Sequence, residues 1–101
     1  MNQTFFYVKD HGIATEDRFP YKGIGMTCKY DESKDKAWQI SDCTEVKVNS
    51  EEALMAAIAQ NPVSVAVQAG ELGFQLYKKG VFSGPCSTKL DHGVLAVGYG
   101  T

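Results

Sequence analysis

The chain lacks a long apolar run, an excess of either charge and any closely paired cysteines. No stretch reaches the roughly 18 apolar residues that a membrane-spanning helix requires, and the first residues are amphipathic instead of forming a basic-then-apolar signal peptide. The chain has ten Lys and Arg and twelve Asp and Glu, so its net charge is −2, and both signs are mixed along the sequence. Neither nucleic acid nor a membrane surface is therefore predicted as a partner.

The cysteine count excludes a closed disulfide set. Cys28, Cys43 and Cys86 are an odd number without Cys-x-x-Cys spacing, so at least one thiol is unpaired or bridged to something else. Cys86, Asp91 and His92 are residue types that zinc accepts, but they lack a recurrent ligand spacing. No metal and no other cofactor is predicted, and Cys43 can equally be a small buried apolar residue.

At 101 residues and 44% hydrophobic, the chain has the size and composition of one soluble globular domain or part of one. Apolar residues at positions 1, 5 and 8, followed by Gly12, predict a short amphipathic helix over residues 2 to 10. Glycines, a proline and charged residues predict a crossing loop over residues 12 to 36, with the charged run 31 to 36 facing solvent.

The remaining pattern alternates between strands and short helices. Polar and apolar residues alternate over 38 to 48, which predicts one strand or a broken pair. Asn49 and Glu52 resemble a capping box and predict a helix over 50 to 60, which Pro62 ends; its inner stripe is Leu54, Ala57 and Ile58. Strands are predicted over 63 to 67, 81 to 82 and 94 to 97, the last buried on both faces, with one helical turn within 70 to 80.

His92 stands where the chain enters the last predicted strand. A histidine in that position is well placed for acid–base chemistry, but its ring nitrogens can also be satisfied by neighbouring backbone. Cys86 lies six residues before His92, so a catalytic thiol–imidazole pair made by these two residues is conceivable.

Several ordered segments carry a wider resemblance. They are Thr15-Glu16-Asp17-Arg18-Phe19-Pro20-Tyr21, Thr27-Cys28-Lys29-Tyr30, Pro62 to Val67, Phe74 to Phe82, Gly84-Pro85-Cys86 and Leu90 to Gly100. Together they resemble the papain-like cysteine proteases, the family of papain and cathepsin L, over essentially the whole chain. No segment resembles that family's nucleophile helix, Gln-Gly-x-Cys-Gly-Ser-Cys-Trp, or its Asn-Ser-Trp-Gly segment.

The resemblance implies roles for individual residues. It makes His92 the catalytic base, places Asp91 at the substrate, and puts Ala66 and Leu90, with Met1, on the wall of the pocket for the substrate residue two before the cut. It also implies that Cys28 and Cys86 form disulfides whose partners lie outside this chain. It assigns Cys86 to structure, which argues against the Cys86–His92 couple as a catalytic pair.

The expected fold is α+β: a twisted, mostly antiparallel sheet resembling the barrel-like second lobe of papain, with one covering helix and an N-terminal helix from the first lobe. The expected division is residues 1–12, the end of the helical lobe; 13–36, the crossing loop; and 37–101, a partial β-rich lobe. We expect this chain to be a fragment of a cysteine endopeptidase that is inactive by itself.

The same resemblance implies partners and a location. Peptides or proteins are the expected substrates of the complete protease, the absent helical lobe is the expected partner, and the fragment is expected to self-associate. A lysosomal, vacuolar or secreted location is implied for the complete protein, although no targeting signal is evident in the chain. The alternative hypothesis is a β-rich binding module or a degenerate, non-catalytic protease homologue.

Overall fold

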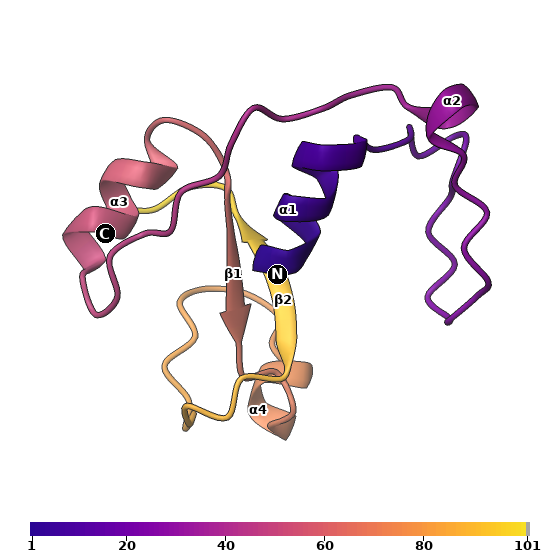
Figure 1. The fold of residues 1–101 in the computed structure, drawn as a ribbon. Coiled ribbons are helices and arrows are strands. Elements are labelled where there is room, and N and C mark those ends of the chain that lie inside the picture. The colour runs from indigo at the N-terminus through magenta and orange to yellow at the C-terminus, as the bar shows by residue number, and fades with distance from the viewer. Residues whose placement is uncertain (101) are drawn as a thin grey trace. The chain divides into compact units, whose positions relative to one another are not determined.

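The computed structural model describes residues 1–100; Thr101 lies outside the described part. The chain divides into two compact units, Met1–Glu45 and Val46–Thr101, which are described separately. The first unit contains helices α1 (Asn2–His11) and α2 (Glu32–Asp35). The second contains helices α3 (Glu51–Ile58) and α4 (Leu72–Gln75) and strands β1 (Val63–Val67) and β2 (His92–Ala96) (Figure 1). Within residues 1–100, no helix is both long and apolar enough to cross a membrane.

The N-terminal helix of the first unit forms as predicted and ends at a glycine. The Gly12 N–H donates to the Val8 carbonyl over 2.9 Å, and Gly12 has a φ of +78°, which favours glycine. A Cβ atom at Gly12 would lie 2.7 Å from both Lys36 Cγ and Trp38 O. Glycine thus allows the returning chain to pass directly against the helix end, where Ile13 and Trp38 form an isolated antiparallel bridge.

The expected crossing loop contains the short helix α2, and one residue of its charged run is buried, contrary to prediction. The Asp35 side chain is 4% exposed; one carboxylate oxygen accepts from Arg18 Nε at 2.6 Å and the other from the Asp31 N–H at 2.9 Å. These hydrogen bonds, first the one from the Asp31 backbone and then that from Arg18, hold the pKa of Asp35 below its ordinary value. Asp35 can be buried because both of its oxygens have partners.

Two predicted strands do not form. Apart from the Ile13–Trp38 bridge, the described residues 38 to 48 and 81 to 82 take part in no strand pairing. Alternating side chains favour an extended backbone, but a strand is stabilised only by hydrogen bonds to a neighbouring strand. These segments have no such neighbour among residues 1–100.

Helix α3 confirms the predicted helix and its inner stripe, with a different start and end. Ser50 is the N-cap, because its Oγ accepts from the Ala53 N–H over 3.2 Å. Asn49 instead has a φ of +55°, a left-handed conformation that asparagine tolerates better than most residues. The helix ends at Ile58, before the Asn61-Pro62 pair, and its half-buried residues are Ala53, Leu54, Ala57 and Ile58.

Strands β1 and β2 form a two-stranded antiparallel sheet, with a register that runs from Val63 opposite Ala96 to Val67 opposite His92. The prediction that the last strand is buried on both faces is wrong: Leu95 is 57% exposed, while Val94 and Ala96 are half-buried. A two-stranded sheet covered on one side leaves alternate side chains in solvent. The antiparallel pairing agrees with the expected α+β fold, but no closed barrel forms among the described residues.

Candidate functional site

The predicted site residues of the second unit gather at the end of the sheet where β1 ends and β2 begins. His92 is opposite Val67 in the strand register, and Ala66 is opposite Gly93 on the adjacent rung. Successive side chains of a strand point to opposite faces, so His92 and Ala66 belong to different faces of the sheet. The structure therefore brings these two residues to the same end of the sheet but not to the same face. Figure 1 shows helix α4 near this end.

Asp91 fastens the start of β2 to the turn that follows β1. Its backbone N–H donates to the Val67 carbonyl over 3.1 Å. Its carboxylate accepts from the Ala69 N–H at 2.7 Å and from the Gly70 N–H at 3.1 Å. Hydrogen bonds to an ionised acceptor are about twice as strong as neutral ones, so Asp91 connects the two segments firmly. Each carboxylate oxygen thus has a backbone N–H donor, and the contact of Asp91 with substrate stays a prediction.

The His92 ring lies exposed beside this connection. Among residues 1–100 no atom forms a hydrogen bond or ion pair with it, so the alternative of a ring satisfied by neighbouring backbone is not what the structure shows. In a neutral imidazole without hydrogen-bond partners, one ring nitrogen is free to accept a proton and the N–H of the other is free to donate one. The backbone that carries this ring is fixed on one side by Asp91 and on the other by pairing with β1.

The other predicted pocket residues are accessible. Leu90, immediately before Asp91, is 60% exposed, and its N–H donates to the Thr88 carbonyl over 3.0 Å. Ala66 is exposed on β1, opposite a glycine that contributes no side chain. This part of the sheet surface is consequently open. Met1 precedes α1 in the first unit, where it is 53% exposed.

The cysteines remain thiols in this structure. Cys28 and Cys86 are exposed, Cys43 is half-buried, and none of the three is paired within the described chain. The disulfides implied for Cys28 and Cys86 therefore stay predictions. Across residues 1–100, no group of three or more His, Cys, Asp and Glu side chains could hold a metal ion.

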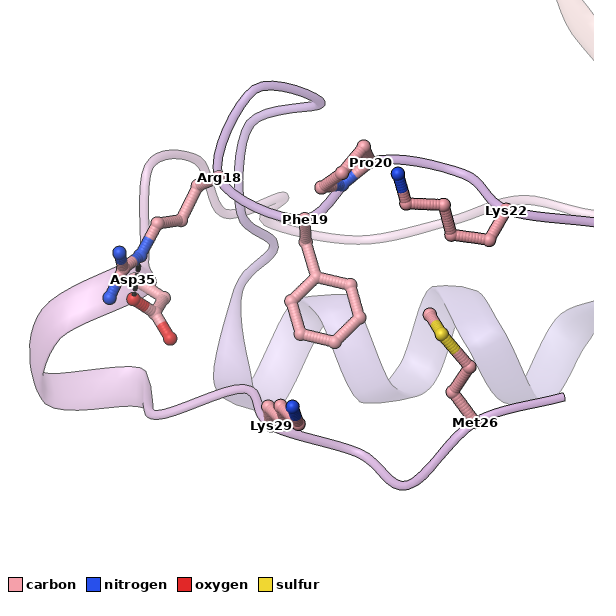
Figure 2. Close-up of a pocket in the computed structure, with 7 residues that line it drawn as sticks. All are labelled: Arg18, Phe19, Pro20, Lys22, Met26, Lys29 and Asp35. Atoms are coloured by element: carbon pink, nitrogen blue, oxygen red, sulfur yellow. Dashed lines mark hydrogen bonds and ion pairs between the residues drawn. The ribbon is translucent and has the colours of Figure 1, made fainter. Parts of the chain in front are cut away.

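A hollow of about 300 Å³ occupies the first unit, and none of the predicted site residues lines it (Figure 2). Its lining consists of Arg18, Phe19, Pro20, Lys22, Met26, Lys29 and Asp35. Arg18 is neutralised by Asp35, whereas the Lys22 and Lys29 ammonium groups form no ion pair with any residue from 1 to 100. The lining of the hollow combines the apolar side chains of Phe19, Pro20 and Met26 with an excess of positive charge. It contains no thiol and no imidazole.

Sequence reasoning missed Gly93, Gly70 and Gln68, three residues at the sheet end. Gly93 lies opposite Ala66, Gly70 approaches the Asp91 carboxylate, and Gln68 contacts the segment before Asp91 through Ser87. The signal available was the family resemblance, which implied a mostly antiparallel sheet. The register needed to match Ala66 with Gly93 was not available, because a shift by one residue exchanges the two faces.

Replacing Gly70 with alanine should weaken the Asp91 connection. Gly70 does not have a positive φ, so the backbone accepts alanine, but the new Cβ would lie 2.7 Å from Asp91 Oδ2. Displacing the carboxylate from one or both N–H groups should lower the free energy of unfolding by about 1–2 kcal/mol in urea denaturation. Gly98→Ala is the matched control, because nothing lies within 4 Å of its Cβ position. Equal stability of the two variants would contradict this role for Asp91.

Comparison with known proteins gives consistent results. A family model described as papain family cysteine protease matches residues 1–101. The chain is 50% identical over 96 residues to the oryzain beta chain of Oryza sativa subsp. japonica, a match that covers 95% of this chain and 21% of that protein. It is 46% identical over 101 residues to the senescence-specific cysteine protease SAG12 of Arabidopsis thaliana, a match that covers 99% of this chain and 29% of that protein.

Two solved structures share the fold. The Carica candamarcensis cysteine protease CMS1MS2, in complex with E-64, superimposes with a TM-score of 0.82 at 40% identity, covering 95% of this chain and 45% of that one. The bromelain protease of Ananas comosus, in complex with the E64 inhibitor, gives a TM-score of 0.85 at 37% identity and covers 97% and 45%. The chain thus spans less than half the length of the proteins it matches.

Proposed function

The chain belongs to the papain family of cysteine proteases, and we propose that it contributes the catalytic histidine and part of the substrate cleft of a cysteine endopeptidase. The observation that carries this proposal is the exposed His92 ring on the first residue of β2, next to the Asp91 connection. His92 is thereby held by its backbone while its imidazole stays accessible. A general base requires that combination of fixed position and free ring nitrogens.

The reaction needs a thiol from a cysteine outside Cys28, Cys43 and Cys86. His92 takes the proton of that thiol, and the thiolate attacks the carbonyl carbon of the peptide bond. The protonated imidazole then gives its proton to the leaving amine, and a thioester remains. Water hydrolyses the thioester with His92 as base, which releases the acid and restores the thiol.

None of the chain's three thiols is proposed as the nucleophile. Cys86 precedes His92 by six residues, but the turn from Ser87 to Leu90 separates them, and no sulfur contact to the ring is present among residues 1–100. A thiol in hydrogen-bond contact with the imidazole is what this chemistry requires. The 101-residue chain alone is therefore proposed to be inactive.

The second part of the proposal concerns the substrate pocket. Ala66 and Gly93 face each other across the sheet, and the exposed Leu90 stands two residues before His92. Small residues paired in this way leave room for a substrate side chain, and the methyl groups of Leu90 and Ala66 favour an apolar one. We propose that this surface receives the substrate residue two before the cut, with preference for Leu, Phe or Val over Arg.

Peptidase assays on two proteins test the proposed function. The complete protein should hydrolyse a fluorogenic dipeptide with an apolar residue second from the cut, and a thiol-alkylating reagent should abolish turnover. The 101-residue chain alone should give no turnover with the same substrate. Turnover by the chain alone that disappears on replacing Cys86 or Cys43 would show that the nucleophile has been misassigned, and an inactive complete protein would support a non-catalytic homologue instead.

A further inference from the structure

The turn before His92 is anchored by a residue that sequence patterns did not single out. Gln68 directly follows β1 and is half-buried. Its side-chain Oε1 accepts the Ser87 N–H at 2.5 Å, and its Nε2 donates to Glu71 Oε1 at 3.0 Å. Gln68 therefore connects three points: the end of β1, the start of α4 and the beginning of the turn that carries Leu90.

The rest of that turn depends on Ser87. The Lys89 N–H donates to Ser87 Oγ over 3.2 Å, and the Leu90 N–H donates to the Thr88 carbonyl over 3.0 Å. Asp91 holds the far end of the turn, while the bond from Ser87 to Gln68 holds the near end. Leu90, which is 60% exposed, has little packing to fix its position. Its place follows from these two attachments of its backbone.

We propose that Gln68 is a positioning residue that sets the place of Leu90 and, through it, the preference of the pocket for the substrate residue two before the cut. This inference rests on the proposed function. It differs from the role of Asp91, which lies next to His92 and holds the far end of the turn; Gln68 acts on the near end. Loss of the Gln68 bond leaves Asp91 and His92 attached and frees the Leu90 side of the pocket.

Glutamine suits this position because the side chain must accept one hydrogen bond and donate another. Methionine has a similar length without either function. Glutamate keeps an acceptor for Ser87 but places a second carboxylate against Glu71, which is unfavourable. Exchanging the pair, Gln68→Glu with Glu71→Gln, restores both contacts, since the amide at position 71 then donates to the carboxylate at position 68.

The experiment compares these variants in the complete protein, with the ratio of kcat/KM for Phe- and Val-containing substrates as readout. Gln68→Met should change this ratio by at least about fivefold, Gln68→Glu should change it in the same direction, and the exchanged pair should restore it. Amide hydrogen exchange at Ser87 should be faster in Gln68→Met and slow again in the exchanged pair. Gln60→Met, on an exposed residue after α3, is the matched control and should leave both readouts unchanged.

The possible failures are distinguishable. An unchanged ratio in an active Gln68→Met variant overturns the inference, even where Ser87 exchange becomes faster, because Gln68 would then be structural only. A changed ratio that the exchanged pair fails to restore while Ser87 is again protected also overturns it. A complete parent protein without peptidase activity overturns the proposed function itself.

Discussion

Replacing His92 with alanine in the complete protein should lower kcat by about a thousandfold while leaving the fold intact. A positioned general acid–base contributes roughly 10²–10⁴-fold to a rate, and a thiol without its base is mostly protonated at neutral pH. The His92 side chain is exposed and forms no hydrogen bond with residues 1–100, so its removal should not disturb packing. Hydrolysis of the fluorogenic dipeptide gives kcat for parent and variant, and thermal unfolding of both proteins checks that the fold is intact.

The matched control is the chain's other histidine. His11 lies at the end of α1, contacts Glu32 through Nδ1 at 3.1 Å and belongs to the first unit. His11→Ala should keep kcat within about twofold of the parent, because the substitution removes an exposed side-chain contact of little energetic value. A His92→Ala variant that folds normally and retains more than a tenth of the parent's kcat would remove His92 from the proposed catalytic role.

Enlarging Ala66 to leucine should change which substrates are cleaved. Ala66 is exposed opposite Gly93, so the larger side chain would occupy the space proposed for the substrate residue two before the cut. Loss of that space should reduce kcat/KM for a Phe-containing substrate about 10- to 100-fold more than for a Val-containing one. Measuring kcat/KM for the two substrates with parent and variant gives this ratio directly.

The same substitution elsewhere separates pocket effects from general ones. Ala56 lies on the exposed side of α3, and Ala56→Leu should leave both substrates equally well cleaved. An equal loss on both substrates for Ala66→Leu would remove Ala66 from the pocket wall. A loss confined to stability, with unchanged kcat/KM for the folded fraction, would lead to the same conclusion.

Local chemistry explains which predictions succeeded. The helix ending at Gly12, the helix before Pro62, the strand of alternating valines and the single helical turn after Gly70 all depend on residues close in sequence. Apolar spacing, a glycine with positive φ and the conformational restriction before proline act over a few residues. The order of residues around His92 also carried a family resemblance, which the comparison with papain family proteases confirmed.

Two of the failures concern interactions between distant residues, and a third is a local shift by one residue. Residues 38 to 48 alternate like a strand, yet no neighbour pairs with them in the described chain, and Asp35 in a charged run became buried because Arg18 reached it from 17 positions away. The helix cap moved from Asn49 to Ser50 because the first hydrogen bond of a helix depends on backbone geometry within one residue.

By itself, the amino-acid sequence determined the family of this protein, the type of most of its elements and the residue that serves as candidate base. Only the tertiary structure decided the register that places Ala66 opposite Gly93 and His92 opposite Val67. It alone showed that Asp91 and Gln68 hold the two ends of the turn carrying Leu90. Helix and strand preferences arise between near neighbours, whereas register and side-chain anchoring arise between residues about 20 to 30 positions apart, which no local pattern encodes.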